Sequence, residues 1–378
     1  MRNKKAAAIV LTTAMALSLA ACGSSGSTSS QSSGSSSSAS SASASSESAS
    51  TSSASEAVSS GSGSSSSSGF AAITDSYEPK GTYKISMIAK VTDEHFAKVE
   101  AGAQAYCDEH PNITIDISSP TSATAYDEQN NAIETAFSND TYDGYVVAPL
   151  SSDSMATLSA NLKKPLIAVD TDFNADAKLA FVGTGNEAAA KSGGEAAIKA
   201  AKEAGIDPTF VILTGVQGDP THDARMNGFK EGAEGAGGQF LETQYCDAIA
   251  DRASTAMEAI IQKYPDGVGC VLCTNDDMCA AAARIARESG NDAYTKTIFC
   301  GFDGNQATVE GIQSGQISMD VAQMGYNMGY MAVEACVKAL DGQQIDKTID
   351  SGSEIIDTSN AADYIQYLKD IGCYNVSK

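Results

Sequence analysis

The sequence contains no tryptophan and only three histidines, His95, His110 and His222, which excludes a histidine-rich metal site. Basic residues are also scarce, because 24 Lys and Arg stand against 47 Asp and Glu, for a net charge of −23. A chain this acidic repels nucleic acid and anionic membrane surfaces, so neither is expected as a partner. The hydrophobic fraction of 42% is enough for a sizeable globular core. We expect neither a bound metal nor a cofactor.

Residues 1–22 are typical of an export signal. Three basic residues precede an apolar run at 6–21 that is short for a membrane-spanning helix. The run ends Leu-Ala-Ala-Cys-Gly, which resembles a bacterial lipobox and implies that Cys22 becomes the lipid-modified first residue of the mature protein. The alternative is an ordinary cleaved signal followed by a chance cysteine. Two acyl chains on Cys22 would suffice for stable anchoring to the cell membrane.

Residues 23–69 consist mainly of Ser, with Gly, Ala and Thr. Because almost no large apolar side chain is present, burial cannot offset the entropy lost on ordering, and we predict a disordered tether. Such a tether would let a folded domain stand off the membrane to which it is anchored. Its length suits a bacterial envelope with a thick, Gram-positive wall.

From about residue 81, short β-rich segments alternate with longer helical patterns. Strands are expected at 84–90, 114–118, 144–148, 165–170, 180–183, 210–214, 239–246, 268–274, 297–301 and 318–322. Helices are expected at 95–109, 126–137, 153–163, 223–235, 252–264, 277–289, 306–314 and 326–340. Apolar strands that are each followed by a helix indicate parallel sheets covered on both faces. Because the strands are too many for one sheet, we predict an α/β fold of two doubly wound lobes.

Polar side chains follow the carboxyl ends of these strands, where open α/β sheets bind their ligands. The set combines carboxylates, amides and an arginine with one aromatic ring, and its members include Asp93, Phe96, Asp170, Arg225, Asn275, Asp303 and Gln323. Bidentate donors and acceptors suit vicinal hydroxyls, and a ring face suits the C–H surface of a sugar. Any single Asp or Asn in the set could instead be a helix N-cap or a turn residue.

The strand ends also stand in a recognisable order. Val-Asp-Thr at 169–171 and Ala-Arg-Met-Asn-Gly-Phe at 224–229 precede Thr-Asn-Asp at 274–276, Gly-Phe-Asp-Gly at 301–304 and Ala-Gln at 322–323. In this order the segments resemble the ribose- and galactose-type sugar-binding proteins of ABC transporters, which have the type I periplasmic-binding-protein fold. The resemblance covers residues 82–350. Related repressors begin with a DNA-binding helix-turn-helix, whereas this chain has an export signal in that place.

The resemblance implies ligand contacts from both lobes. They would come from Asp93, His95, Phe96, Asp170, Thr171, Arg225, Asn275, Asp303 and Gln323. Phe96 would stack on the ligand, while Asp170 and Arg225 would each grip hydroxyls from opposite lobes. Ribose binders carry Arg at the position of Thr171, and an aromatic at that of His95. These two departures favour a ligand other than ribose, since the planar guanidinium of the ribose binders is lost at Thr171.

The resemblance also implies a three-segment hinge, with crossings near Asn186, near Gln323–Met324 and near Ser351. The lobes would then comprise 82–186 with 324–350, and 187–323 with 351–378. A ligand that bridges the lobes binds the closed arrangement better than the open one and shifts the population toward closure. The closed form is what a membrane permease would recognise.

We therefore expect a monomeric, extracytoplasmic solute-binding lipoprotein that captures a sugar or polyol and delivers it to an ABC permease, with no enzymatic step. One alternative is a sensory receptor of the same fold that presents a sugar or an autoinducer-like signal molecule to a membrane kinase or chemoreceptor. Another is a carbohydrate-active enzyme that uses two carboxylates of the cleft.

Eight further cysteines cannot be paired from the sequence. They are Cys107, Cys246, Cys270, Cys273, Cys279, Cys300, Cys336 and Cys373. Cys270 and Cys273 lie on an apolar strand, where residues three apart point to opposite faces. We expect separate buried thiols there rather than a redox or zinc site. Cys273 and Cys300 are expected on neighbouring strands.

Overall fold

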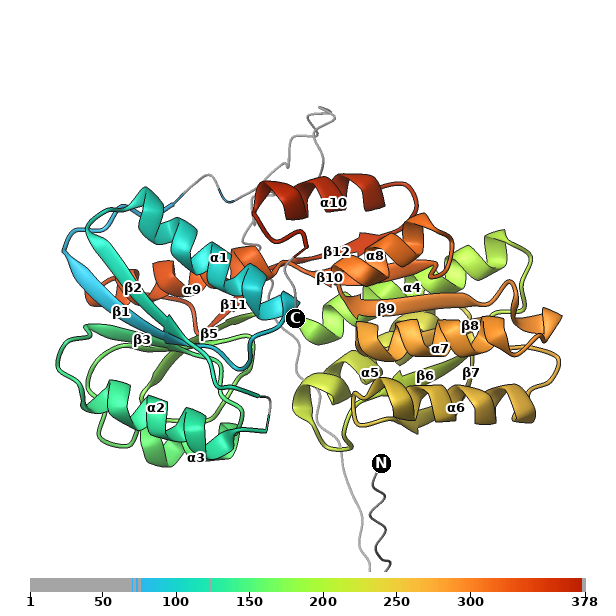
Figure 1. Cartoon of the computed structure of the whole chain (residues 1–378), viewed down its shortest axis with the longest axis horizontal. Coiled ribbons are helices and arrows are strands. Elements are labelled where there is room, and N and C mark those ends of the chain that lie inside the picture. Colours follow the sequence, from blue (N-terminus) through green and yellow to red (C-terminus); the bar gives the residue numbers. More distant parts are fainter. Residues whose placement is uncertain (1–69, 71–72, 74–75, 123, 376–378) are drawn as a thin grey trace, which may run out of the picture. The chain divides into compact units, whose positions relative to one another are not determined.

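The computed structural model describes residues 70–375, apart from 71–72, 74–75 and 123. The export signal at 1–22, the lipidation site Cys22 and the tether at 23–69 lie outside the described residues. The described chain forms two lobes, each built on a six-stranded sheet (Figure 1). The predicted α/β class with two doubly wound lobes is therefore confirmed.

The first lobe contains a wholly parallel sheet in the order β11-β5-β4-β3-β1-β2. Its strands are β1 (Tyr83–Ile88), β2 (Ile113–Ser118), β3 (Gly144–Val147), β4 (Leu166–Val169), β5 (Lys178–Gly183) and β11 (Thr348–Asp350). One apolar core packs this sheet against α1 (Glu94–Glu109) and α9 (Gly325–Leu340). A second core lies on the other face, under α2 (Tyr126–Ser138) and α3 (Ser152–Leu158).

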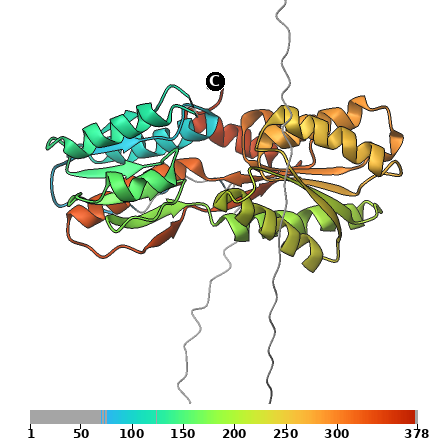
Figure 2. The same ribbon diagram turned by 90° about the horizontal axis from the view of Figure 1, so that it is seen from below.

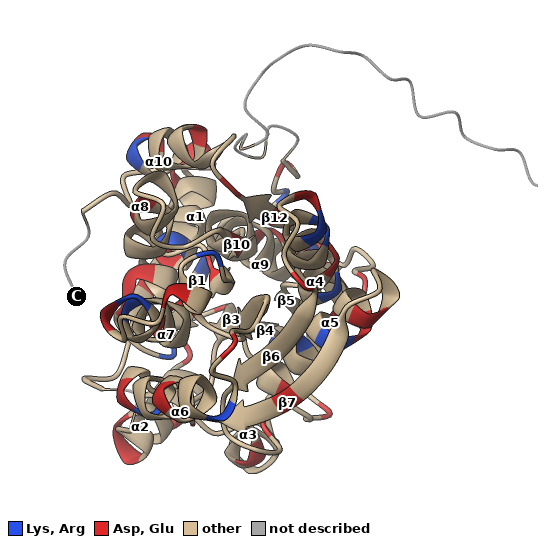
Figure 3. Cartoon of the chain, turned by 90° about the vertical axis from the view of Figure 1, so that its right-hand side faces the viewer, with Lys and Arg blue, Asp and Glu red and all other residues tan. Residues whose placement is uncertain are grey.

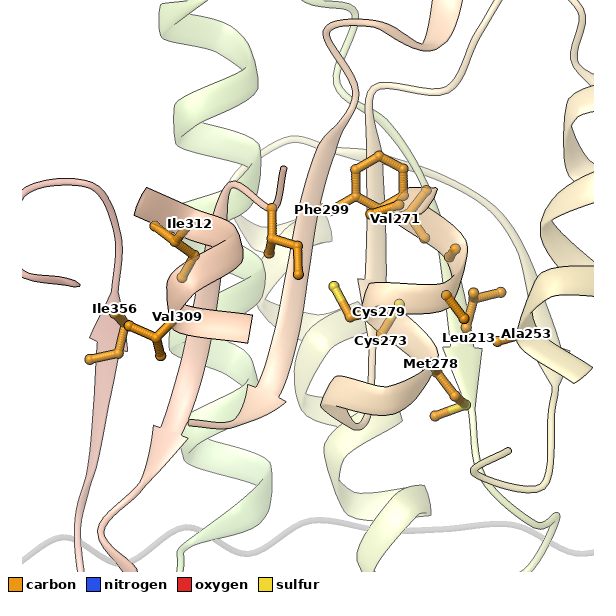
Figure 4. Close-up of a cluster of buried hydrophobic side chains, with 14 of the residues drawn as sticks. Leu213, Ala253, Val271, Cys273, Met278, Cys279, Phe299, Val309, Ile312 and Ile356 are labelled. Carbon is orange, nitrogen blue, oxygen red and sulfur yellow. The ribbon is translucent and has the colours of Figure 1, made fainter. Parts of the chain in front are cut away.

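The second lobe repeats this order as β12-β10-β9-β8-β6-β7. Its strands are β6 (Thr209–Thr214), β7 (Gln239–Tyr245), β8 (Cys270–Cys273), β9 (Ile298–Asp303), β10 (Met319–Gln323) and β12 (Ser353–Ile356). One face packs on α4 (Asn186–Glu203) and α5 (Pro220–Gly235). The other packs on α6 (Ala250–Lys263), α7 (Asp276–Glu288), α8 (Gln306–Gln313) and α10 (Ala361–Asp370), and Figure 4 shows part of that core. A short 3₁₀ turn covers Asp292–Tyr294.

The chain passes between the lobes three times, as the fold prediction requires. It leaves the first sheet after β5, returns after β10, and crosses again between β11 and β12. Only two residues separate β11 from β12, and β12 runs antiparallel to β10. The residue-level lobe boundaries, 82–186 with 324–350 and 187–323 with 351–378, stay a prediction.

In each lobe one helix pair packs closely through glycines. A Cβ on Gly329 of α9 would lie 1.8 Å from the carbonyl oxygen of Val99 in α1. A Cβ on Gly232 of α5 would lie 2.0 Å from the carbonyl oxygen of Lys191 in α4. No side chain fits at either position, because real Cβ contacts do not come that close. The close packing of α1 on α9 and of α4 on α5 fixes the positions of helices that begin next to the polar strand ends.

Four elements were not predicted from the sequence, namely α4, α10, β11 and β12. Helix α4 carries Gly193 and Gly194 in its interior, which lowers its intrinsic helix propensity. The structure explains both, since a Cβ on Gly194 would lie 2.4 Å from the carbonyl oxygen of Phe229 in α5, and a Cβ on Gly193 would lie 2.5 Å from Cγ2 of Val321 in β10. Strands β11 and β12 have three and four residues, too few for a clear alternation pattern.

All eight cysteines of the described chain are buried and free. Cys270 and Cys273 belong to the cores on opposite faces of the second sheet, which confirms their predicted separation. Cys273 and Cys300 lie on the neighbouring strands β8 and β9, where Cys300 stands opposite Leu272 in register. Burial raises the pKa of the Cys270 thiol to about 12, so it is a protonated packing group at neutral pH.

The described surface mixes both signs of charge despite the acidic balance. Figure 3 shows acidic and basic residues side by side on α4 of the second lobe, where Glu195 and Lys199 are among them. Within the described chain no helix has the length and apolar character needed to cross a membrane. No group of three His, Cys, Asp or Glu in that part of the chain could hold a metal ion.

Candidate functional site: the cleft between the lobes

The carboxyl ends of the two sheets border one cavity of about 380 Å³, in the size range of small-molecule sites, roughly 300–1,000 Å³. Residues of both lobes contribute to its lining, and Figure 2 shows the two lobes side by side, seen from below. The structure brings all nine residues predicted as ligand contacts to this cavity: Asp93, His95, Phe96, Asp170, Thr171, Arg225, Asn275, Asp303 and Gln323. Lys90, Asp172, Asp219 and His222 are among the lining residues that complete it.

On the first lobe the central group is Asp170, directly after β4. Its Oδ1 lies 2.8 Å from Nε2 of His95, and its Oδ2 accepts a 2.8 Å hydrogen bond from the Thr171 hydroxyl. The ammonium of Lys90 lies 3.3 Å from the same hydroxyl. Burial would raise the pKa of Asp170, but the bonds and charges of His95 and Lys90 outweigh it and hold the pKa well below its usual range. Asp170 is therefore a carboxylate at neutral pH.

The main chain of Asp170 has a φ of +60°, in the left-handed region that costs most residues energy. Asp303, at the end of β9 in the second lobe, has a φ of +131°. Asp tolerates positive φ better than most residues, yet such conformations persist only where the surroundings enforce them. These two carboxylates with positive φ, one in each lobe, both line the cleft.

On the second lobe a nearly buried arginine holds Asp303. One terminal nitrogen of Arg225 donates to Oδ1 of Asp303 at 3.0 Å and to the carbonyl of Thr274 at 3.0 Å. Nε of Arg225 donates to Asn186 at the start of α4, and its guanidinium lies 3.9 Å above the ring of Phe302. The Gln323 amide donates a second bond to Oδ1 of Asp303 at 2.8 Å. These contacts fix Asp303 from two sides.

His222 belongs to this site, although it was not among the residues predicted to contact a ligand. Its Nδ1 lies 2.8 Å from the hydroxyl of Thr274, which in turn donates to Thr214. Since the Thr274 hydroxyl donates there, Nδ1 of His222 carries the hydrogen and Nε2 is left as an acceptor. Burial and the neighbouring Arg225 charge lower the pKa of His222 to about 4, so the ring is neutral at pH 7.

A sequence signal for His222 exists in its spacing. It stands three residues before Arg225 in α5, and residues three apart share one helix face. The predicted helix began at residue 223, whereas α5 begins at Pro220 because Asp219 accepts hydrogen bonds from the amides of Thr221 and His222. That shift of the start places His222 on the helix instead of before it.

Two of the predicted residues are helix N-caps, which was the alternative for any single Asp or Asn. Oδ1 of Asp93 accepts the amide of Phe96 at the start of α1. Oδ1 of Asn275 accepts the amide of Met278, and its Nδ2 donates to the carbonyl of Ala248. Both residues border the cavity, but Asn275 uses both ends of its amide within the protein. The ring of Phe96 is only 3% exposed and packs edge-on against His95.

This fold and this two-lobed cleft define a class of protein. The chain belongs to the periplasmic binding protein domain family, whose model matches residues 85–344. Membership confirms the family that the strand-end motifs indicated, including the type I fold.

Two curated relatives share part of the chain. The ribose import binding protein RbsB of Bacillus subtilis is 32% identical over 137 residues, which is 36% of this chain and 43% of that protein. RbsB of Escherichia coli is 25% identical over 142 residues, 38% of this chain and 47% of that protein. The aligned region thus spans less than half the length of either relative. Both are named as binding proteins rather than as enzymes.

Solved structures show the same fold at low sequence identity. A periplasmic ribose ABC transporter protein from Conexibacter woesei superposes with a TM-score of 0.69 at 22% identity, over 79% of this chain and 99% of that one. A solute-binding protein from Actinobacillus succinogenes with bound D-allose gives 0.66 at 18%, over 75% and 100%. A myo-inositol complex from Bacillus halodurans gives 0.64 at 19%, over 76% and 98%.

Proposed function

We propose that this protein is an extracytoplasmic solute-binding lipoprotein that captures a sugar or polyol between its lobes and delivers it to an ABC permease. The observation that carries the proposal is the pair of strained carboxylates, Asp170 and Asp303, which border one cavity from opposite lobes. His95 positions Asp170 and Arg225 positions Asp303, and each carboxylate still has room to accept hydrogen bonds from the hydroxyls of one ligand. A ligand that uses both would bind the closed arrangement selectively.

Several groups around the cavity have hydrogen-bond donors or acceptors that are not used within the described chain. Among the described residues, the second terminal nitrogen of Arg225 and Nε2 of His222 have no hydrogen-bond partner. Lys90 bonds only the Thr171 hydroxyl within that part of the chain. A hydroxyl can donate to one group and accept from another, which matches this mixture of donors and acceptors. A neutral, hydroxyl-rich ring is the ligand that fits best.

The solved relatives support a cyclic polyol, because they include complexes with bound D-allose, myo-inositol and D-arabinose. Each carboxylate of the cleft is already engaged within the protein, Asp170 by His95 and Asp303 by Arg225, as suits groups that hold a ligand in place. We therefore propose binding without chemistry.

Calorimetric titration with D-ribose, D-allose, D-arabinose, D-fucose and myo-inositol tests the ligand class. At least one should bind, and Asp170→Asn and Asp303→Asn should each weaken that binding about 10-fold or more, as expected for lost bonds to a charged group. Asp116→Asn is the matched control, because Asp116 lies outside the cavity on β2, paired with Lys84. If no sugar in the panel bound, or if both cleft variants bound as tightly as wild type, the proposal would fail.

Anchoring and delivery need separate tests. Cys22→Ser should release the protein from the membrane fraction of an expressing bacterium, and retention of this variant would contradict lipidation. For delivery, membrane vesicles that contain an ABC sugar permease from the same organism should take up the bound sugar only when the protein is added. Uptake that does not depend on the protein would remove the permease from the proposal.

A further inference from the structure

Lys98 belongs to the first lobe, but its ammonium group contacts the main chain of the second lobe. It sits in the second turn of α1 and is 1% exposed. Its Nζ donates to the carbonyl of Gly304 at 2.9 Å and to that of Asp303 at 3.3 Å, more than 200 residues away in sequence. Burying an ammonium costs several kcal/mol unless its surroundings compensate it, so a buried lysine without an ion-pair partner needs an explanation.

The two carbonyls belong to the β9–α8 loop, which carries the cleft carboxylate Asp303. This loop has an unusual main chain, with a φ of +131° at Asp303 and +71° at Gly304. Helix α1 holds it at a second point, where the Glu94 carboxylate accepts the amide of Gln306. The first turn of α1 thus reaches the loop of the second lobe while His95 of the same turn contacts Asp170 in the first.

Two buried carboxyls lie behind the loop. Asp276 accepts the amides of Phe302 at 3.1 Å and Asn305 at 2.8 Å. Asp320 is fully buried, and its carboxyl interacts with that of Asp276. A Cβ on Gly301 would lie 2.4 Å from Oδ1 of Asp276 and 2.8 Å from Oδ1 of Asp320, so both carboxyls flank that glycine.

Two carboxyls so close in a dry interior cannot both ionise. Burial raises the pKa of Asp320 to about 6, and burial together with the Asp320 charge raises the pKa of Asp276 well above its usual range. Between them they hold one proton and one negative charge near neutral pH. The charge of Lys98 lowers the pKa of Asp320, so the ammonium lies within electrostatic reach of this carboxyl pair.

We propose that Lys98 is an interlobe latch: it ties α1 of the first lobe to the β9–α8 loop of the second, sets the position of Asp303 and favours the closed arrangement before a ligand arrives. Lys98 is a positioning residue, since it acts on the ligand site through the main chain of Asp303. The latch goes beyond the proposed function, because it concerns the empty protein and does not depend on which molecule binds. A larger closed population raises the apparent affinity by the same factor.

The test measures the distance between the lobes in the ligand-free, full-length protein. Spin labels attached through ketone-bearing unnatural residues at Glu134 in α2 and Glu258 in α6 avoid the native thiols, and both positions are exposed. Pulsed electron spectroscopy then gives the distance distribution between the lobes. Lys98→Met should reduce the short-distance fraction by about threefold or more and weaken the best sugar of the panel by a similar factor.

Two controls separate a latch from a merely structural lysine. Tyr364→Phe removes another donor to the Gly304 carbonyl, at 3.0 Å, but Tyr364 belongs to the second lobe itself, so the distance distribution should not change. Lys199→Met removes an exposed lysine of α4 and should change neither the distance nor the affinity. If Lys98→Met lowered only the melting temperature and kept the wild-type distances, the latch would be wrong.

A third variant covers the case in which Lys98→Met does not fold. Glu94→Ala removes the other contact from α1 to the loop and leaves Lys98 in place. It should widen the distance distribution in the same direction and by a smaller amount, whereas an unchanged distribution would overturn the latch. Because these distances are measured without ligand, a failed sugar panel would refute the proposed function and leave the latch to be judged separately.

Discussion

The two lobes place a base and a carboxylate at corresponding points of the same strand order, with different chemistry. Asp170 follows β4 and Asp303 ends β9, and these strands occupy the same position in their sheets. The basic residue comes in each case from the helix that follows the lobe's first strand along the chain, His95 from α1 after β1 and Arg225 from α5 after β6. The scaffold is duplicated, therefore, while the groups that meet a ligand are not.

This difference affects how each carboxylate of the cleft is held. Asp303 accepts hydrogen bonds from Arg225 and Gln323, and Arg225 is itself fixed by Asn186. Asp170 is held instead by the imidazole of His95 and the hydroxyl of Thr171. The second lobe therefore presents its carboxylate beside a guanidinium, and the first lobe beside an imidazole.

Breaking the arginine pair should have the largest effect. Arg225→Ala leaves Asp303 with one amide partner in a largely buried position, which should cost about 3–5 kcal/mol in the free energy of unfolding. Urea denaturation measures that loss. Arg284→Ala, in an exposed pair with Glu288, is the control and should cost less than about 1 kcal/mol. Equal losses would mean that the pair in the cleft is no more than a surface contact.

The buried carboxyl pair distinguishes the second lobe from the first in its pH dependence. Because folding raises the pKa of Asp320 to about 6, the stabilisation is complete below the unfolded value near 4 and is lost as pH rises through 6. That loss amounts to about 3 kcal/mol. Asp320→Asn, whose amide can donate to Asp276, should remove the loss, so the variant should gain stability relative to wild type between pH 4 and 7.

Denaturant titrations at several pH values check this prediction. The matched control is Asp357→Asn, because Asp357 lies at the surface of the same lobe and bonds only within its own turn. A wild type and an Asp320→Asn variant with parallel stability curves over this range would show that the pair does not share a proton.

Asp170 should show the opposite sign. Folding lowers its pKa well below the unfolded value near 4, so its stabilisation is complete above that value and is lost progressively as pH falls from 4 through the folded pKa. Asp170→Asn should therefore destabilise the protein at pH 7 by about 1.5–3 kcal/mol, the range for hydrogen bonds to charged groups, and by progressively less below pH 4. A deficit that grew as pH fell below 4 would contradict the ionised pair.

The glycine-packed helix pairs should behave alike in the two lobes. Gly329→Ala and Gly232→Ala each force a methyl group against a helix backbone, which should cost about 1–3 kcal/mol apiece. Thermal unfolding of both variants measures the cost. Gly235→Ala is the control, since a Cβ there meets nothing within 4 Å and should leave stability unchanged or slightly raised. A large difference between the first two variants would break the structural equivalence of the pairs.

Much of the fold and of the candidate site could be predicted because both are encoded locally. Apolar runs such as 144–148 predict buried strands, and the polar residues that follow them predict which edge of the sheet faces a ligand. Helix α4 could not be predicted with the same ease, because Gly193 and Gly194 are unfavourable in an isolated helix and are explained only by close packing against β10 and α5. His222 follows the same strand end as Arg225 but was not among the predicted ligand contacts, which were taken from the family resemblance.

By itself the sequence determined the two-lobed α/β class, the acidic balance and the set of strand-end residues, because periodicity and charge are properties of short segments. Only the tertiary structure decided which of those residues meet. The pairing of His95 with Asp170 and the entry of Lys98 into the other lobe each join segments that are 75 to 206 residues apart. Lys98 reads in the sequence as an ordinary surface lysine. Its burial follows from long-range packing, which no local pattern specifies.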